Sequence, residues 1–341
     1  MLKKIHLENF MLLQKQQLEF GQINIFAGVN DTGKTSLLKL IYASIKAREE
    51  SKNRKIKNFF DHLSSKIINV FGIERLSELV TKSQEKLKVE LYFSDHSHYE
   101  FSFSSKTSKN IVPSSNLDQE NFGLQTVFIP PKEVLTLRNL IRTTIEQYNF
   151  KGYDDTYYDL VKALDVPIHK GKRAKVFSEI DKELEIMLSG RIISIGNDFV
   201  FKKGKYKYSI SLTAEGIKKI GIFNQLLKNK TIQNATILII DEPEMALHPQ
   251  IISKFSKMLY DLSNAGVQIF MATHSYFVIK SFQILAQKHK SDVFLFNMVN
   301  SQTIAIEKNN LKEGMPSNEI IDSSITLFEA ESKIKFNKLG I

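Results

Sequence analysis

The sequence contains no cysteine and no long hydrophobic run. Without cysteine, the 341-residue chain can form neither disulfides nor cysteine-ligated zinc sites. No apolar stretch approaches the roughly 18 residues that a membrane-spanning helix needs, and the first residues lack the pattern of a signal peptide. We therefore expect a cytoplasmic protein with no membrane partner.

Basic residues outnumber acidic ones, 47 to 37, and most of the basic residues are lysine. A net charge of +10 attracts nucleic acid through its phosphates, although scattered lysines are often only a solvated surface. Three segments are more densely basic than the rest of the chain: 46–57, 170–175 and 202–207. These segments are the candidate contacts for DNA or RNA.

The most informative stretch is Gly28-Val29-Asn30-Asp31-Thr32-Gly33-Lys34-Thr35, which matches G-x-x-x-x-G-K-[ST] at every fixed position. Apolar residues at 23–27 predict a buried strand before it, and helical spacing from Leu37 to Ile45 predicts a helix after it. Backbone N–H groups of such a loop bind polyphosphate. Lys34 is expected to act on the β- and γ-phosphates, and Thr35 to bind Mg²⁺. The expected ATP contacts are Asn30, Asp31, Thr32, Gly33, Lys34, Thr35 and Ser36.

In a second motif, the aliphatic run 235–240 is followed by Asp241 and Glu242. The run predicts a buried parallel strand, and open α/β sheets bind ligands at the carboxyl ends of their strands. We expect Asp241 to hold Mg²⁺ and Glu242 to act as the general base for the attacking water.

A third constellation, 268–275, is again an apolar run that ends in polar residues. His274 lies where a side chain could donate a hydrogen bond to the γ-phosphate or to the water. The alternative is a structural histidine at the end of a strand.

The remaining sequence is organised around these three motifs in one domain, 1–341, of the α/β class. A strand at 1–10 opens the chain, and a hairpin is predicted from 88–93 and 99–103 with its turn between. Helical spacing predicts a helical lobe, 132–190, inserted into the core. The second half of the core, 191–300, begins with strands at 192–201 and 205–212. A closing segment, 301–341, contains a helix at 317–336 that is expected to pack inward through Ile320, Ile321, Ile325, Leu327 and Phe328.

With these motifs, the chain resembles an ABC-type ATPase head of the SMC, RecF and OLD kind. It is most similar to the stand-alone bacterial AAA-family ATP-binding proteins related to the ATPase part of OLD nucleases. The residues that carry the resemblance are the strand at 5–10, the loop at 28–35, and the segments 241–244, 247–249 and 272–275. The resemblance implies a P-loop NTPase fold in which two heads sandwich ATP. OLD nucleases continue into a metal-binding nuclease domain, and too few residues follow Ser275 for one.

In this class, a signature segment of one head contacts the γ-phosphate held by the other head. Its usual form is Leu-Ser-x-Gly before a helix. The matching place holds Leu212-Thr213-Ala214-Glu215-Gly216, so the resemblance implies a nucleotide contact at Gly216. Ala214 replaces the serine, and Thr213 is then the hydroxyl that remains. The alternative is an ordinary helix with Thr213 as its N-cap.

The resemblance implies a Mg²⁺-dependent ATPase, with ATP and Mg²⁺ as cofactors, that forms a homodimer or higher homo-oligomer around nucleotide. It would gate a partner protein or nucleic acid in genome maintenance or antiphage defence. One alternative is a nucleotide-sensing scaffold that hydrolyses ATP slowly and holds a toxic effector encoded nearby inactive. The other is the motor subunit of a membrane transporter, which the altered signature and the inserted segment disfavour.

Overall fold

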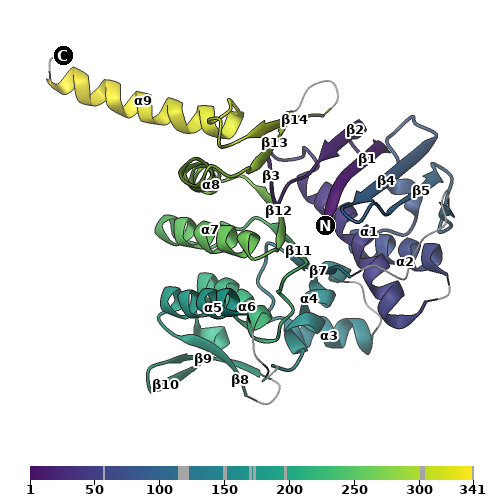
Figure 1. The fold of residues 1–341 in the computed structure, drawn as a ribbon, viewed down its shortest axis with the longest axis horizontal. Coiled ribbons are helices and arrows are strands. Elements are labelled where there is room, and N and C mark those ends of the chain that lie inside the picture. The colour runs from purple at the N-terminus through teal and green to yellow at the C-terminus, as the bar shows by residue number, and fades with distance from the viewer. Residues whose placement is uncertain are drawn as a thin grey trace.

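The computed structural model of the chain describes residues 1–56, 58–113, 123–148, 152–168, 171, 174–195, 198–299 and 304–339. A six-stranded sheet lies at the centre. Two further sheets, of five and three strands, are antiparallel and share no strand with it. Helices pack around the central sheet (Figure 1). Within this part of the chain, no helix is both long and apolar enough to cross a membrane.

The central sheet has the strand order β14-β13-β3-β12-β11-β7. All neighbouring pairs are parallel except β13 and β14. Every residue of β3, β11 and β12 is buried, as parallel strands covered on both faces require. The buried strands predicted beside the three motifs are thus confirmed. The strands are β3 (Ile23–Ala27), β7 (Gln125–Ile129), β11 (Thr236–Asp241), β12 (Gln268–Thr273), β13 (Phe294–Val299) and β14 (Ala305–Asn310).

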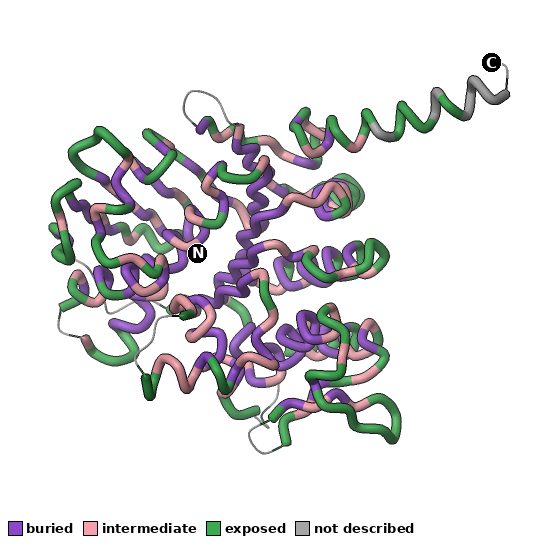
Figure 2. The backbone as a smooth tube through the Cα atoms, turned by 180° about the vertical axis from the view of Figure 1, so that it is seen from behind, coloured by how far each residue is buried: buried purple, intermediate pink, exposed green. Residues whose placement is uncertain are grey.

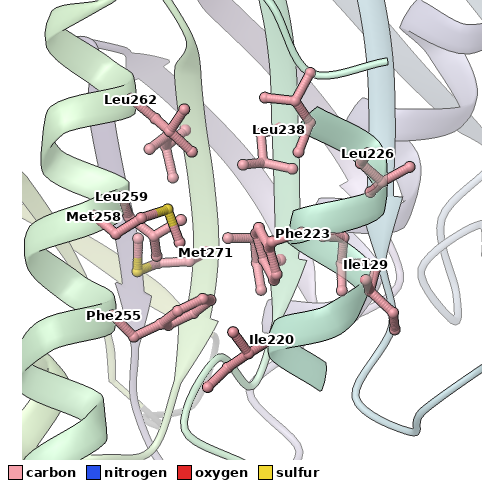
Figure 3. Close-up of a cluster of buried hydrophobic side chains, with 14 of the residues drawn as sticks. Ile129, Ile220, Phe223, Leu226, Leu238, Phe255, Met258, Leu259, Leu262 and Met271 are labelled. Carbon is pink, nitrogen blue, oxygen red and sulfur yellow. The ribbon is translucent and has the colours of Figure 1, made fainter. Parts of the chain in front are cut away.

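One face of this sheet is covered by helices that stack beside it in Figure 1. They are α6 (Glu215–Lys228), α7 (Pro249–Asn264) and α8 (Tyr276–His289). Figure 3 shows apolar side chains of α6 and α7 meeting those of β11 and β12. Phe223 of α6 and Phe255 of α7 pack edge to face with ring centroids 4.8 Å apart, the geometry that aromatic pairs favour. This core fixes α6 relative to the end of β11.

The other face is covered by α1 (Lys34–Arg54), α2 (Phe59–Phe71) and the five-stranded sheet. That sheet has the order β2-β1-β4-β5-β6 and contains the predicted hairpin. Gln268 of β12 ties it to the centre, because its side chain bonds both the N–H and the C=O of Leu2. The strands are β1 (Leu2–Phe10), β2 (Leu13–Glu19), β4 (Lys86–Phe93), β5 (His98–Ser104) and β6 (Val112–Pro113).

The described residues of 132–190 are mainly helical, as predicted. Its helices are α3 (Arg138–Glu146), α4 (Asp155–Asp165) and α5 (Lys175–Leu188). Their buried side chains, among them Ile141, Leu160 and Leu184, belong to the same hydrophobic cluster as β7 and β11. The boundaries proposed for a separate lobe stay a prediction.

The strands predicted at 192–201 and 205–212 differ from the structure. The first prediction spans two strands, β8 (Arg191–Ile195) and β9 (Asp198–Lys203), and β10 ends earlier than predicted (Tyr206–Ser209). Residues Ile210–Leu212 form a short 3₁₀ turn instead. The three strands make an antiparallel sheet of their own, in the order β10-β9-β8. Strand propensity located these residues but could not assign them to a sheet.

The C-terminal helix α9 (Glu319–Leu339) forms where a helix was predicted, but the inward packing predicted for Ile325 and Phe328 was wrong, and the side chain of Leu327 lies outside the described residues. Ile321 is buried and Ile320 is partly buried, whereas Ile325 and Phe328 are exposed. Figures 1 and 2 show why: beyond its first turn, the helix projects away from the rest of the molecule.

The first basic segment, 46–57, is an open cationic surface only in its second half. In its first half, Lys46 pairs with Glu49 at 2.8 Å, and Arg48 is buried with its guanidinium over the rings of Phe93 and Tyr99. Lys52, Arg54 and Lys55 are exposed. Most of the cations of 170–175 lie outside the described residues, and 202–207 is largely exposed.

Candidate functional site

The three predicted motifs meet at one edge of the central sheet. In the strand order, β12 separates β3 from β11, and all three run parallel. Their carboxyl ends therefore lie side by side. The glycine-rich loop follows β3, His274 follows β12, and Asp241 and Glu242 end β11. Sequence motifs more than 200 residues apart thus form one site, as the crevice at the carboxyl edge of a parallel sheet predicts.

The loop 28–33 turns the chain from β3 into α1. Gly28 is required there, because a Cβ atom would lie 2.4 Å from the carbonyl oxygen of Met298. Asp31 and Gly33 have left-handed backbone angles, with φ of 62° and 85°. The N–H groups of the first turn of α1 have no partner within the helix, so they point to any anion bound at its N-terminus. Asn30 and Asp31 are exposed, Thr32 is buried and Ser36 is partly buried.

The side chain of Lys34 folds back onto the loop that precedes it. Its Nζ donates to the carbonyl oxygens of Gly28 at 2.9 Å and Val29 at 2.6 Å, and it lies 3.2 Å from Thr32 Oγ1. Burial lowers the pKa of Lys34 to about 8, although Asp241 and Glu242 act in the opposite direction. The ammonium is held among oxygen acceptors at the helix N-terminus, where a phosphate oxygen would compete for it.

Thr35 and Asp241 form the next contact. Thr35 Oγ1 lies 3.1 Å from Asp241 Oδ1 and 3.0 Å from Oδ2. Burial raises the pKa of Asp241 to about 6, and the Thr35 hydrogen bond opposes that rise only in part. A hydroxyl and a buried carboxylate are hard oxygen donors that fit Mg²⁺. Among the described residues, no three His, Cys, Asp or Glu side chains cluster as a metal site, so further ligands would come from phosphate and water.

Glu242 has a left-handed backbone, φ 50°, which is uncommon for a non-glycine residue. Both of its peptide groups are held. Its N–H donates to Ala272 O at 2.9 Å, and its carbonyl oxygen accepts a hydrogen bond from Lys219 Nζ. The backbone of Glu242 is therefore held on both sides of its Cα atom.

His274 and Glu244 complete the edge. Glu244 Oε1 accepts hydrogen bonds from Thr273 Oγ1 at 2.8 Å and from the N–H of His274 at 2.9 Å. Burial and the Lys34 charge lower the pKa of His274, which favours the neutral ring. The structure thus places His274 beside the loop, where it was predicted.

The segment around Gly216 lies at the start of α6, close to the same edge. A Cβ atom on Gly216 would lie 2.8 Å from Ala246 O, which explains the glycine. The alternative of a Thr213 cap is wrong: Ala214 is the N-cap residue, and Thr213 Oγ1 donates to Ile210 O at 2.7 Å. A nucleotide contact at Gly216 stays a prediction.

Two residues of the site were missed from the sequence, Lys219 and Glu244. Lys219 is 3% exposed on a helix whose other buried residues are mainly apolar. The signal that could have identified Lys219 from the sequence is a charged residue on the buried face of a predicted helix. Glu244 was read as part of the Asp-Glu motif and given no role of its own.

The family described as "AAA domain, putative AbiEii toxin, Type IV TA system" matches residues 23–280. This range includes all three motifs. No curated protein matches the chain.

Solved structures resemble the chain over most of its length. An SMC head bound to the C-winged helix domain of ScpA is 12% identical, with a TM-score of 0.56, and the match covers 92% of this chain and 98% of that one. An SMC head with an extended coiled coil, bound to the C-terminal domain of ScpA derived from Pyrococcus furiosus, is 10% identical. Its TM-score is 0.53, and 97% and 99% of the two chains are covered. RecF with ATP is 17% identical with a TM-score of 0.46, covering 91% and 99%. The predicted fold, a P-loop ABC-type ATPase head, is confirmed.

Proposed function

Because the chain belongs to this AAA-domain family, we propose that it is a Mg²⁺-dependent ATPase that works as a dimer around nucleotide. One observation carries the proposal. Lys34, the Thr35–Asp241 pair and Glu242 converge on the N-terminus of α1, although β12 separates the two strands that supply them. Oxygen donors for a divalent cation, a lysine for phosphate and a carboxylate for water are the set that phosphoryl transfer to water needs.

The roles follow from the geometry of the residues. The loop N–H groups and Lys34 bind the phosphates, and Thr35 and Asp241 hold Mg²⁺. When bound, Mg²⁺ neutralises charge on the phosphate oxygens. Glu242 accepts a proton from the attacking water, and His274, neutral and beside Gly28, donates a hydrogen bond toward the γ-phosphate. The test is steady-state phosphate release with ATP and Mg²⁺, compared with the same protein in excess chelator. Absence of Mg²⁺-dependent release would reject the proposal.

Exposed apolar side chains around this edge support a second copy of the chain as a partner. Leu212, just before α6, is 81% exposed, and Met245 and Phe277 are exposed beside Glu242 and His274. Large apolar side chains gathered near a charged site are typical of an interface. In the proposed dimer, the Gly216 segment of one copy faces the nucleotide held by the other.

The N-cap position of α6 offers a direct prediction. Ala214 is exposed and makes no cap hydrogen bond, so Ala214→Asp should stabilise the helix as an N-cap. The new carboxylate would repel a γ-phosphate bound by the other copy. We expect ATP affinity to persist while turnover falls to near background. Ala214→Ser, which restores the usual signature serine, is the control and should keep turnover; full turnover in Ala214→Asp would argue against the shared site.

The small sheet supports nucleic acid as the gated partner. Register places Arg191, Lys202 and Lys207 in one row across its three strands. Within the described residues, none of the three pairs with a carboxylate, and like charges in such a row destabilise a sheet. Two exposed tyrosines, Tyr206 and Tyr208, lie on the same hairpin and could stack on bases.

If this row binds phosphates, the logarithm of affinity for a DNA or RNA oligonucleotide should fall linearly with the logarithm of salt concentration. Neutralising Lys202 and Lys207 with glutamine should make the slope shallower by about 0.7–0.9 for each lysine–phosphate interaction that the substitutions remove. Lys257→Gln, on the exposed surface of α7, is the control for loss of a surface lysine elsewhere and should leave the slope unchanged. An equal slope in all three proteins would assign the row to solvent.

The alternative is a nucleotide-sensing scaffold that controls a toxic effector. The family description, which names a putative AbiEii toxin of a Type IV TA system, favours keeping this candidate, as does the role in antiphage defence proposed by resemblance. Turnover measured with and without nucleic acid separates the two. Stimulation supports the gating ATPase, whereas slow, unstimulated turnover and a small protein that copurifies support the scaffold.

A further inference from the structure

Lys219 is a buried cation next to the backbone of Glu242. It lies on α6, one turn beyond Gly216, and its Nζ donates to the carbonyl oxygen of Glu242. Burial lowers the pKa of Lys219 to about 8, against the raising effect of Glu244, Glu242 and Asp241. An ammonium that is 3% exposed is costly in a core, so packing alone does not explain it.

Glu244 is a partly buried carboxylate near the same loop. One oxygen, Oε1, accepts hydrogen bonds from Thr273 Oγ1 and from the backbone N–H of His274. The other, Oε2, is buried without a hydrogen-bond partner among the described residues. The charge of Glu244 opposes the lowering of the Lys219 pKa by burial.

The start of α6 also touches the loop after β11 directly. Gly216 packs against Ala246 O, with room for no side chain between them. Together with the Lys219 bond, this holds α6 to the 242–246 loop at two points, one turn apart. A shift of α6 would therefore pull on the carbonyl oxygen of Glu242, which also accepts a hydrogen bond from the N–H of Met245 at 3.1 Å.

We propose that Lys219 is a positioning residue: it fixes Glu242 in its left-handed conformation and couples the general base to α6. The inference rests on the proposed function. The first turn of α6 is the part proposed to contact the nucleotide bound by the other copy. That contact would be transmitted through Lys219 to Glu242 of the copy that carries this α6. Glu244 serves the same role for His274, by holding its N–H.

The decisive experiment is a double-mutant cycle with Lys219→Met and Glu242→Gln, read as kcat and as ATP affinity. Lys219→Met should lower kcat by roughly 10- to 100-fold, within the range for loss of base positioning, and change ATP affinity less than about 2-fold. In the Glu242→Gln background, it should lower kcat by no more than about 2-fold further, because the base it positions is already gone.

Lys228→Met is the matched control. Lys228 is also an ion-paired lysine of α6, bonded to Glu185 at 2.8 Å, but it lies at the far end of the helix. Its kcat should match that of the wild type. Lys219→Arg, which keeps the charge and donors, should regain part of the turnover.

Unchanged kcat in Lys219→Met, or losses that multiply in the double variant, would overturn the positioning role. If Lys219→Met does not fold, Lys219→Gln takes its place in the cycle with the same two expectations. A wild-type protein without Mg²⁺-dependent turnover would instead reject the proposed function itself. If Glu242→Gln abolishes turnover while Lys219→Met leaves it unchanged, the proposed function stands and only the positioning role of Lys219 is rejected.

Discussion

Glu242→Gln should bind ATP with Mg²⁺ as well as the wild type does and should hydrolyse it at least ~10²-fold more slowly. The substitution keeps the size and a hydrogen-bonding group but removes the carboxylate that accepts the proton, and a positioned base contributes about that factor or more. The backbone of residue 242 is held from both sides, by Ala272 and by Lys219. The glutamine should therefore occupy the same place, and the loss should reflect chemistry rather than structure.

Single-turnover measurements with excess enzyme separate the chemical step from product release. Asp241→Asn is the companion variant and should weaken the binding of Mg²⁺, because Asp241 accepts hydrogen bonds from the Thr35 hydroxyl and is proposed to hold the metal. Loss of nucleotide binding in Glu242→Gln, with normal Mg²⁺ dependence in Asp241→Asn, would mean that the two carboxylates have the opposite roles.

Lys34→Ala should abolish turnover and weaken ATP binding. A charge-assisted hydrogen bond contributes about 1.5–3 kcal/mol, or roughly 10- to 150-fold in affinity, and Lys34 can make more than one to a triphosphate. Stability should not fall. The pKa of Lys34 is lowered in the folded state, so below pH 8 its charge opposes folding, and alanine removes that cost.

Isothermal titration with ATP and a melting curve test both parts of this prediction. Lys257→Ala removes an equal charge from the surface of α7 and is the control that should keep wild-type affinity and turnover. Wild-type affinity in Lys34→Ala would show that the loop does not bind the phosphates. A large drop in melting temperature would instead show that the lysine holds the loop together through Gly28 and Val29.

The sequence indicated which residues lie at the carboxyl edge of the sheet because each motif is encoded locally. A buried strand followed by polar residues places those residues at a known edge of a parallel sheet, so the convergence of Lys34, Asp241 and His274 follows from the strand order alone. Lys219 could not be placed in this way. Its role depends on the distance between α6 and the 242–246 loop, which the shared core of Phe223 and Phe255 sets.

The two errors in the fold have the same origin. The residues of 192–212 predict strands but do not say which sheet they join, and among the described residues these strands pair with each other alone. The apolar residues of α9 have the spacing of a buried face. Burial, however, depends on where the helix points, and after Ile321 it points away from the core. Periodicity reports what a segment can bury, whereas tertiary packing decides what it does bury.

The central claim is that each ATP site is shared between two copies of the chain, and a mixing experiment tests it most directly. Ala214→Asp chains lack a working α6 segment, and Lys34→Ala chains lack a working phosphate loop. A mixed dimer keeps one site with both parts native. Equal amounts should pair at random, so about half of the dimers are mixed and roughly a quarter of wild-type turnover should return. No recovery of turnover, in a mixture in which pull-down demonstrates mixed dimers, would contradict the shared site.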